Sequence, residues 1–394
     1  MRVSRCTKKE PPMRNGSRTH VRCLLMRGGS SRGPFFDARD LPADTAERDT
    51  VLLAVMGSPD PLQIDGVGGG HPLTSKAGIV APATGDADVE WTFAQLQPDS
   101  DRVDTTPNCG NMLAAVLPFA IETGMVTPTG DTTTARVLTR NTGAIAEITV
   151  QTPAADDGTR YVRYDGDARI DGVPGTAAPV RIGFVDTAGS VAGSLLPTGN
   201  VRDTVVVPGV GPIDVTMIDN GQPLVVVDAR GLGATGEESP EEIDADDALR
   251  ARIEALRIVT GHAMGLGDVT TKPYPKMTLV SAPRNGGTIS TRSLIPHRTH
   301  RSIGVLAAVT AATAAVLPGS VAHGLAVTPP VTTAETGPET TLSVEHPTGE
   351  FSVTLGLDPD DPTHVTRSAL LRTARLIMAG EAMVPSTVFR GDPA

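Results

Sequence analysis

The sequence predicts an α+β protein built from two pseudo-repeated domains, each a mixed sheet wrapped around a central helix. Three observations predict this class. Segments of similar sequence recur in the same order roughly 200 residues apart. Each half contains one alanine-rich apolar run that is long enough for a buried helix. The 42 glycines and 33 prolines among 394 residues indicate many turns between short strands.

The first repeated segments predict a strand, an acidic helix and a second strand in each half. Residues 36–41 (FDARDL) correspond to residues 227–232 (VDARGL), and each segment is followed by an acidic stretch that predicts a helix. In the second half this helix is amphipathic over 237–258. Residues 75–80 (SKAGIV) correspond to residues 275–280 (PKMTLV), and both segments predict strands.

The predicted central helices carry the clearest repeat. Leu-Ala-Ala-Val occurs at 113–116 and at 306–309, within apolar runs over 112–121 and 303–317. A Thr-Gly pair then precedes a predicted strand in each half. Because the correspondences keep their order, we expect two similar domains whose central helices point their N-termini into a cleft between them.

The domain boundary is expected near residue 190, where residues 186–200 are rich in small residues and proline. We expect residues 1–20 to be a disordered extension, residues 21–189 to form the N-terminal domain and residues 190–394 to form the C-terminal domain. Met13 and Met26 are alternative translation starts to Met1. Residues 328–340, rich in threonine and proline, predict a loop, and a closing strand is expected over 382–388.

The composition excludes several classes of partner. A net charge of -11 disfavours nucleic acids and anionic membranes, and with 3% aromatic residues no base-stacking surface is expected. Neither the residues before Met26 nor the apolar run over 303–317 has the features of a signal peptide or a membrane span. Three cysteines favour a reducing cytoplasm over a disulfide framework, and the scattered histidines predict no metal site.

Cys109 is the main candidate for a reactive side chain. It stands directly before a predicted buried helix, where unpaired N–H groups and the helix dipole favour a thiolate or a bound carboxylate. A small buried cysteine without chemistry is the alternative interpretation. Ser302 aligns with Cys109 in the second half, and neither Cys6 nor Cys23 does, so no second thiol is expected opposite Cys109.

Lys76 is the second candidate. It follows a glycine run at 68–70, which lets backbone approach a ligand closely while one amine is delivered to it. Burial among glycines and apolar residues would favour the neutral amine, which can act as a base. His300, shortly before the second apolar run, is a candidate partner for a carboxylate, and a structural role for it is an equal alternative. Arg27 and Arg32 are either carboxylate ligands or solvated surface residues.

Five motifs together resemble one known family. They are residues 26–36 (MRGGSSRGPFF), 72–76 (PLTSK), 108–111 (NCGN), 196–199 (LPTG) and 372–385. In this order they resemble the PrpF family, which includes 2-methylaconitate cis-trans isomerases, 4-oxalomesaconate tautomerases and methylitaconate Δ-isomerases. The usual opening of the family is closer to MRGGTSKG, so Ser30 and Arg32 are conservative departures that bear on the choice of substrate.

The resemblance implies the diaminopimelate epimerase-like fold, with the last strand returning to the first domain, and an isomerase that needs no cofactor and no metal. It implies that Lys76 and Cys109 are catalytic and move a proton along an allylic or keto-enol system flanked by carboxylates. Lys76 is expected to abstract the proton, and Cys109 either returns it at the far carbon or orients the substrate. The residues expected to bind the substrate are Gly29, Ser30, Ser31, Arg32, Thr74, Ser75, Asn108, Gly110, Asn111, Thr142, His300 and Ser302.

Two other functions stay open at this point. A non-catalytic protein could use the same cleft to bind a carboxylate or to support a partner enzyme, although binding alone does not require a thiol at a helix start. An amino acid epimerase would need a second base opposite Cys109, where Ser302 is a poor candidate. The expected partner is a small-molecule carboxylate. Its identity, the pathway and a homodimeric assembly stay open.

Overall fold

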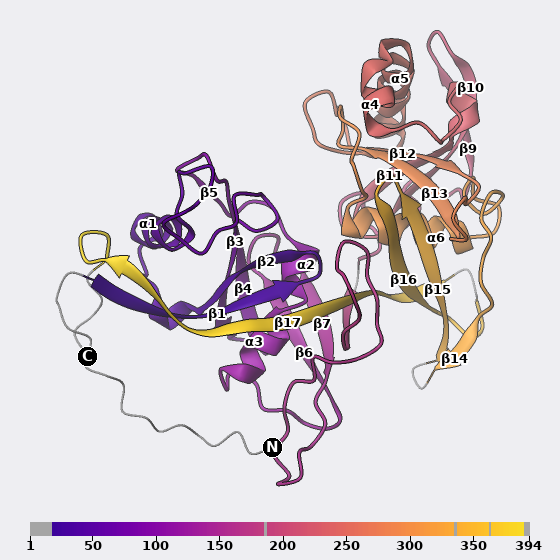
Figure 1. Ribbon diagram of the computed structural model, residues 1–394. Coiled ribbons are helices and arrows are strands. Elements are labelled where there is room, and N and C mark those ends of the chain that lie inside the picture. Colours follow the sequence, from indigo (N-terminus) through magenta and orange to yellow (C-terminus); the bar gives the residue numbers. More distant parts are fainter. Residues whose placement is uncertain (1–17, 185–186, 335–336, 362–363, 390–394) are drawn as a thin grey trace. The chain divides into compact units, whose positions relative to one another are not determined.

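The computed structural model describes residues 18–184, 187–334, 337–361 and 364–389 of the 394-residue chain (Figure 1). These residues form antiparallel and parallel strands with few helices, so the predicted α+β class is confirmed. Cys6 and most of the predicted extension lie outside the described residues. Disorder was wrong for residues 18–20, which begin the first strand: the next residue, Val21, is buried, and the His20 ring lies 3.6 Å from the Glu381 carboxylate.

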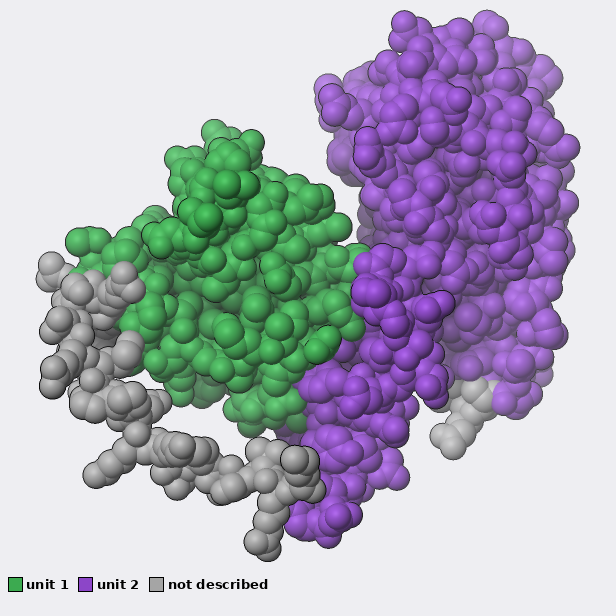
Figure 2. All heavy atoms as spheres, in the orientation of Figure 1, with its two compact units in different colours: residues 1–125, 138–143, 375–394 green, residues 126–137, 144–374 purple. Residues whose placement is uncertain are grey.

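The structure divides into two compact units, coloured separately in Figure 2. Unit 1 is formed from Met1–Met125, Leu138–Gly143 and Arg375–Ala394, as far as these ranges are described. Unit 2 is formed from Val126–Val137 and Ala144–Ala374, again within the described residues. The units do not follow the predicted boundary near residue 190, because strands that precede it pair with strands that follow it.

The elements of unit 1 are, in chain order, β1 (Arg18–Gly28), β2 (Ser31–Asp37), the 3-10 helix η1 (Ala38–Asp40), α1 (Thr45–Met56), β3 (Lys76–Pro82), β4 (Val89–Leu96), β5 (Val103–Asp104), α2 (Gly110–Leu113) and α3 (Val116–Glu122). Two strands contribute residues to both units, namely β6 (Thr132–Thr139) and β17 (Val365–Pro385).

The elements of unit 2 are β7 (Ile145–Gln151), β8 (Pro179–Phe184), β9 (Asp203–Val207), β10 (Gly211–Asp219), β11 (Pro223–Asp228), the 3-10 helix η2 (Ala229–Leu232), α4 (Pro240–Ala245), α5 (Asp247–Ala263), β12 (Lys276–Ser281), β13 (Ile289–Leu294), α6 (Val305–Val316), β14 (Thr332–Ala334), β15 (Gly337–His346) and β16 (Gly349–Leu357). β8 pairs with β7 and with residues 368–373 of β17, which explains why β7 and β8 belong to this unit.

Local sequence explains how unit 1 presents Lys76. Asp44 begins α1 by accepting hydrogen bonds from the N–H groups of the first turn, and Gly57, with φ of 82°, ends the helix in the left-handed conformation. The buried face of α1 packs with residues of β1 to β4 in one apolar core. β3 runs parallel to β2 and antiparallel to β4, and its first residue, Lys76, is opposite Gln95 of β4.

The apolar run predicted as one helix over 112–121 forms two short helices, α2 and α3. Pro118 explains the interruption, because proline has no N–H and its ring conflicts with the helical position of the Ala114 carbonyl four residues earlier. The backbone makes tighter bonds there: Ala114 N donates to Asn111 O at 3.2 Å, and Ala115 N donates to Met112 O at 3.0 Å. Both helices are buried, so burial was predicted correctly and continuity was wrong.

Several local structures of unit 2 match those of unit 1. The Asp228 carboxylate caps η2 by accepting from Arg230 N, as the Asp37 carboxylate caps η1 by accepting from Arg39 N. β12 runs parallel to β11 and antiparallel to β13, as β3 runs parallel to β2 and antiparallel to β4. The matches concern these segments, and duplication of whole domains stays a prediction.

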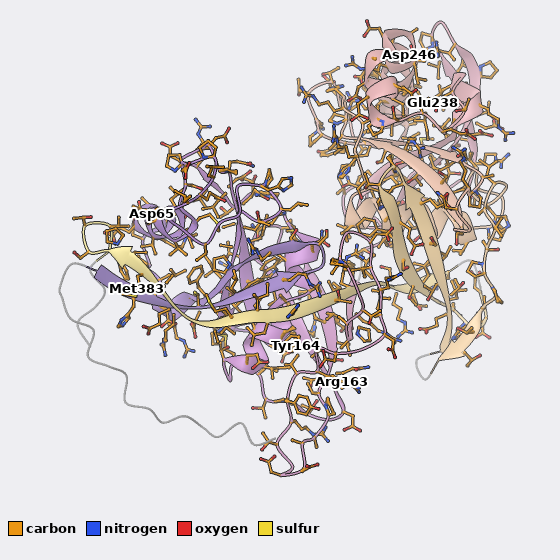
Figure 3. The ribbon with its side chains drawn as sticks, viewed as in Figure 1. Asp65, Arg163, Tyr164, Glu238, Asp246 and Met383 are labelled. Atoms are coloured by element: carbon orange, nitrogen blue, oxygen red, sulfur yellow. The ribbon has the colours of Figure 1, made fainter. Side chains whose placement is uncertain are left out.

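The helix predicted over 237–258 forms two helices, α4 and α5. Ser239 begins α4 with a capping box, and Asp246 ends α4 and caps α5 by accepting from Leu249 N. Figure 3 labels Glu238 and Asp246, which flank α4. The aspartate therefore divides one amphipathic stretch, because its side chain satisfies the N–H groups of a new helix start.

Helix α6 is the central helix of unit 2. It is continuous over Val305–Val316, and every residue from Ala307 to Ala315 is buried. Its small side chains allow β10, β11, β15 and β16 to pack closely around it. Thr313 accepts a hydrogen bond from Asn220 Nδ2 at 2.9 Å, which satisfies a buried amide. The predicted buried helix is confirmed.

Two predictions for the last part of the chain are corrected. Residues 328–340, predicted as a loop, include β14 and the start of β15, which pair antiparallel. Threonine favours strands, and this property outweighs the proline content there. The closing strand, predicted over 382–388, is much longer and begins earlier. β17 spans Val365–Pro385, and its first residues pair antiparallel with β16.

Candidate active site

The centre of the candidate site is a contact between a lysine and a thiol in unit 1. Lys76 Nζ lies 3.5 Å from Cys109 Sγ. Lys76 is only 8% exposed, and its ammonium position lies 5.3 Å from the centre of the Phe93 ring. Cys109 is half-buried. The two residues are therefore brought together as predicted, with the amine in a largely apolar setting and the thiol partly open to solvent.

Cys109 is the residue directly before α2, and its backbone is extended. The backbone N–H of Cys109 donates a hydrogen bond to Asn108 Oδ1 at 2.8 Å, and no side chain caps the helix start. Because α2 has only four residues, the long-helix dipole expected at Cys109 is absent. The first N–H groups of this short turn still point outward without helical partners.

The β1–β2 turn lies directly against the start of α2. A Cβ at Gly28 would collide with the Asn111 carbonyl oxygen, and a Cβ at Gly29, with φ of 51°, would collide with the Asn111 side chain. Asn111 Nδ2 donates to Ser30 Oγ at 3.2 Å. Only glycine allows this approach, so the glycine pair brings the predicted binding residues of both segments together.

Two polar groups of this turn have no hydrogen-bond partner among the described residues. Ser31 Oγ is buried in a side chain that is 1% exposed, and Arg32 Nε is buried as well. Buried donors without partners are rare in folded proteins. That Ser31 and Arg32 bind the substrate stays a prediction.

The segment before Lys76 is fixed by internal hydrogen bonds. Ser75 Oγ contacts Gln63 Oε1 and the His71 carbonyl, both at 2.8 Å, and Thr74 Oγ1 donates to the same carbonyl at 3.1 Å. Arg32 N donates to Leu73 O at 3.0 Å, which ties this segment to β2. The Ser75 hydroxyl thus supports the position of Lys76, and its role as a direct substrate ligand stays a prediction.

Asn141, which was not predicted as a site residue, also shapes the site. Asn141 accepts from Phe93 N at 2.8 Å and donates to the carbonyls of Phe93 and Thr105 at 2.9 and 2.6 Å. It thereby joins the strand that carries Phe93 to the segment that leads to Cys109. The Asn-Thr-Gly turn was the only available signal, and it led to Thr142, which is exposed and bonds to Thr139.

His300 and Ser302 belong to unit 2, where they precede α6. Ser302 N donates to His300 Nδ1 at 2.9 Å, and Ser302 Oγ lies 3.2 Å from His346 Nε2. Burial and, second, the charge of Lys276 lower the pKa of His300. Burial lowers the pKa of His346 to about 4, so His346 is neutral at physiological pH. His346 and Lys276 were not selected as site residues from the sequence.

Among the described residues, no three histidine, cysteine, aspartate or glutamate side chains gather in a way that could hold a metal ion. No helix in the same part of the chain is long and apolar enough to span a membrane.

Comparison with known proteins agrees with the class that the fold and the site define, an isomerase. The chain belongs to the PrpF family, whose model, described as PrpF protein, matches residues 18–385. Among curated proteins it is 50% identical over 374 residues to a (4E)-oxalomesaconate Delta-isomerase of Novosphingobium sp. strain KA1, with 95% of this chain and 100% of the relative covered. It is equally similar, at 50%, to a 4-oxalomesaconate tautomerase of Pseudomonas putida, covering 95% and 98% of the two chains.

Solved structures give the same family and fold. The crystal structure of a methylitaconate-delta-isomerase superposes with a TM-score of 0.79 at 33% sequence identity, covering 94% of this chain and 97% of that one. The fold class, the family and the isomerase class predicted from the sequence are confirmed.

Proposed function

We propose that the protein catalyses an allylic or keto-enol proton shift, without a cofactor, in a small unsaturated di- or tricarboxylate. The observation that carries the proposal is the 3.5 Å contact between Lys76 Nζ and Cys109 Sγ. It offers a base and an acid side by side, on two segments that the fold holds rigidly. Proton transfer between two carbon atoms of one substrate needs both.

Lys76 is the proposed base. A C–H bond between an alkene and a carboxylate is a weak acid, so its base must be neutral and close. Among the described residues no carboxylate forms an ion pair with Lys76, and the side chain is largely buried. The neighbours that the structure gives the amine are the Cys109 thiol at 3.5 Å and the Phe93 ring at 5.3 Å.

Cys109 is the proposed acid. In the forward direction Lys76 takes a proton from one carbon and becomes an ammonium, while the substrate becomes a dienolate. The Cys109 thiol then gives its proton to the far carbon of the dienolate and becomes a thiolate. Transfer of the proton from Lys76 to Cys109 across their contact restores both groups, so no proton is gained or lost in a cycle.

Hydrogen-bond donors must stabilise the negative charge that develops on the dienolate. Ser31 Oγ and Arg32 Nε have no hydrogen-bond partner among the described residues, and the first turn of α2 offers backbone N–H groups. We assign the substrate carboxylates to these groups and to the residues around them, Gly29, Ser30, Thr74, Asn108, Gly110 and Asn111. In this proposal Ser75 and Thr142 support the neighbouring backbone. His300 and Ser302, which belong to unit 2, stay candidates for binding a carboxylate.

The first substrate to test is 4-oxalomesaconate. Two relatives that cover nearly the whole chain at 50% identity are named for isomerisation or tautomerisation of oxalomesaconate. A 3-methylitaconate isomerase of Eubacterium barkeri and a 2-methyl-aconitate isomerase of Shewanella oneidensis are less similar, at 37% and 33% identity. The sparse cysteines favour a reducing cytoplasm as the place of reaction.

Proton NMR in D2O tests the proposal. The protein is incubated with 4-oxalomesaconate, 2-methylaconitate, methylitaconate and the two aconitates, and deuterium uptake at each carbon is followed. We expect uptake with at least one compound, lost in Lys76→Ala. Lys272→Ala, which removes a lysine of unit 2, is the control for a general effect of lost charge.

Two outcomes would overturn the proposal. If a compound binds but neither isomerises nor exchanges, a carboxylate-binding or accessory protein becomes the better description. If exchange survives in Lys76→Ala at the wild-type rate, the base lies elsewhere in the protein.

A further inference from the structure

Gln63 lies in the segment between α1 and β3 and is buried, although its two neighbours in the chain are not. Gln63 is 1% exposed, whereas Leu62 and Ile64 are 72% and 83% exposed. A polar residue buried between two exposed apolar residues is the reverse of the usual arrangement. The contacts of the Gln63 side chain must therefore compensate for its removal from water.

The backbone of Gln63 is also unusual. Its φ of 50° lies in the left-handed region, and among the described residues Gln63 is the one residue other than glycine with a positive φ. Glycine adopts this conformation without strain. A glutamine in its place indicates that the side chain is needed at this position.

The Gln63 amide connects three parts of the segment. Its Oε1 accepts hydrogen bonds from Gly70 N at 2.9 Å and from Ser75 Oγ at 2.8 Å, and its Nε2 donates to Ser58 Oγ at 3.1 Å. The bond from Gly70 N fixes which end of the amide is the oxygen, because a backbone N–H needs an acceptor. One buried side chain thus joins the start of the segment, the glycine run and the residue directly before Lys76.

The glycine run lies directly against this amide. A Cβ at Gly68 would collide with Gln63 Oε1, and a Cβ at Gly69 would collide with the Arg32 guanidinium. Only glycine permits both approaches. The run therefore contacts Gln63 with one residue and Arg32, a predicted substrate ligand, with the next, before the chain reaches Lys76.

Ser75 is held through its backbone and through its side chain. Its carbonyl accepts from Leu96 N of β4 at 2.9 Å. Its hydroxyl has two acceptors, Gln63 Oε1 and the His71 carbonyl, both at 2.8 Å. The peptide group that joins Ser75 to Lys76 therefore has little freedom to rotate.

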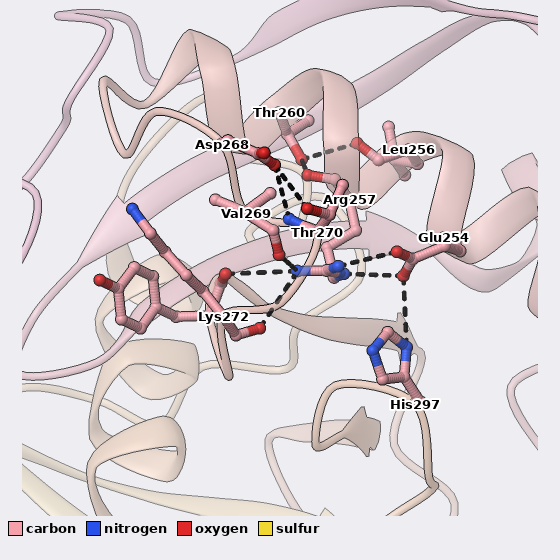
Figure 4. Close-up of polar contacts among 10 residues, drawn as sticks. Glu254, Leu256, Arg257, Thr260, Asp268, Val269, Thr270, Lys272 and His297 are labelled. Carbon is pink, nitrogen blue, oxygen red and sulfur yellow. Dashed lines mark hydrogen bonds and ion pairs between the residues drawn. The ribbon is translucent and has the colours of Figure 1, made fainter.

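In unit 2 the residue before the lysine cannot form such a bond. Pro275 precedes Lys276 and has neither a hydroxyl nor an N–H. The loop before β12 is fixed by Arg257 of α5, which is fully buried (Figure 4). Its guanidinium donates to the carbonyls of Val269 and Tyr274 at 2.8 and 3.3 Å. The side-chain bond to the residue beside the lysine thus occurs in the unit whose lysine contacts a thiol.

We propose that Gln63 is a positioning residue for the reaction, which acts through Ser75 to hold Lys76 in contact with Cys109. This role rests on the proposed function, in which Lys76 is the base. The Gln63 amide fixes the backbone from which the Lys76 side chain extends, so that Nζ stays 3.5 Å from Cys109 Sγ. Neither the sequence motifs nor the family resemblance selected Gln63.

Steady-state kinetics with 4-oxalomesaconate test this role in Gln63→Met, Ser75→Ala and the double variant. Methionine keeps the length of the glutamine side chain and removes its amide. Because the base acts in the transition state, we expect kcat per folded molecule to fall at least about tenfold in Gln63→Met, while KM changes by less than about threefold. If Gln63 acts through Ser75, the double variant should stay within about twofold of the slower single variant.

Gln97→Met is the matched control. Gln97 is exposed and contacts Ser58, as Gln63 does, but through its backbone carbonyl, which the substitution leaves in place. Its kcat should equal that of the wild type within about twofold.

Alkylation of Cys109 by iodoacetamide, followed by mass spectrometry of its peptide, measures the same contact without a substrate. An amine beside a thiol promotes the reactive thiolate, so loss of the contact should slow alkylation. We expect the rate to fall at least about threefold in Lys76→Ala and by a similar factor in Gln63→Met, and to stay unchanged in Gln97→Met.

Three results would overturn the proposal: a kcat of Gln63→Met within about threefold of the wild type, an unchanged alkylation rate in that variant, or effects that multiply in the double variant. A lower melting temperature with both readouts unchanged would overturn it too, since Gln63 would then serve stability alone.

If Gln63→Met does not fold, as judged by circular dichroism, Ser75→Ala decides by the same two readouts, because it removes the hydroxyl that Gln63 holds. Failure of the proposed function is distinguishable. An alkylation rate that depends on Gln63, in a protein that isomerises no substrate, would leave the positioning of Lys76 standing.

Discussion

Lys76 and Lys276 begin strands with the same pairing pattern, yet the two units surround them with different groups. Lys76 contacts a thiol and an aromatic ring, while the amine of Lys276 lies at the start of α6, a twelve-residue helix without a side-chain cap. In our proposal the first setting pairs a base with an acid, whereas the residues of unit 2 include no cysteine. One backbone frame thus places its lysine in two different settings. The residue directly before the helix also differs, being Cys109 in unit 1 and Gly304 in unit 2.

Cys109→Ser is expected to have the largest effect, because it removes the proposed acid. A serine hydroxyl is a much weaker acid than a thiol, so kcat should fall about 1,000-fold. Deuterium uptake at the carbon from which Lys76 abstracts should persist, since the base is unchanged. Steady-state kinetics and NMR exchange measure the two steps separately.

Cys23→Ala is the control for loss of a thiol. Cys23 is buried in β1, and burial raises its pKa to about 11, so it takes no part in proton transfer at neutral pH. The kcat of the Cys23→Ala variant should equal that of the wild type. A Cys109→Ser enzyme within threefold of wild-type kcat would show that Cys109 only orients the substrate.

Ala311→Pro tests whether a proline explains why unit 1 has two short helices where unit 2 has the continuous helix α6. By the shared Leu-Ala-Ala-Val tetrad, Ala311 of α6 corresponds to Pro118 of α3. In the middle of a continuous helix proline removes a hydrogen bond and clashes with the preceding turn, so the free energy of unfolding should fall by at least about 3 kcal/mol. Urea unfolding measures it, and Pro118→Ala, at a helix start, should change stability by less than about 1 kcal/mol. Equal effects would mean that the two helices differ for another reason.

The pH dependence of stability should differ between wild type and His346→Gln. Burial lowers the pKa of His346 to about 4, below the 6.5 of an ordinary histidine. A group whose pKa is lower in the folded state gives stability that is complete above pH 6.5 and is lost as pH falls toward 4. With allowance for partial access of water, the loss is about 2 kcal/mol.

The His346→Gln variant should therefore lose less stability than the wild type between pH 6.5 and 4, as followed by urea unfolding at each pH. The exposed His262, replaced by glutamine, is the control. Parallel pH profiles for the wild type and His346→Gln would contradict the assignment of a neutral, buried ring.

The smallest effects are expected for the two capping aspartates, Asp37 and Asp228, which make the same hydrogen bond in the two units. Asp37→Ala and Asp228→Ala each remove a side chain that accepts from the second N–H along a 3-10 helix, and each should cost about 1 kcal/mol. The asparagine variants keep the acceptor and should cost less. Thermal unfolding measures all four, and unequal losses would show that the two caps do different work.

The sequence was informative where a local rule fixes the outcome. The strands that begin at Lys76 and Lys276 and the buried apolar run of α6 were predicted from residue chemistry. The aspartate caps of η1 and η2 and the approach of two glycines to Asn111 appeared only in the structure. The pairing of Lys76 with Cys109 was also predicted, although from a family resemblance. The lengths of helices were less predictable, because Pro118 and Asp246 end one helix and begin another within stretches whose hydrophobic period continues.

The amino-acid sequence by itself determined the α+β class, the family and the two catalytic candidates, because each of these depends on residue types and on their order. Only the tertiary structure decided which side chains contact each other: Asn141 with Phe93, Ser302 with His346, and Lys276 with the start of α6. The physical reason is that burial and the lack of a partner are properties of the packed chain. The sequence does not show which groups surround Lys276, whereas in the fold no carboxylate among the described residues forms an ion pair with its amine.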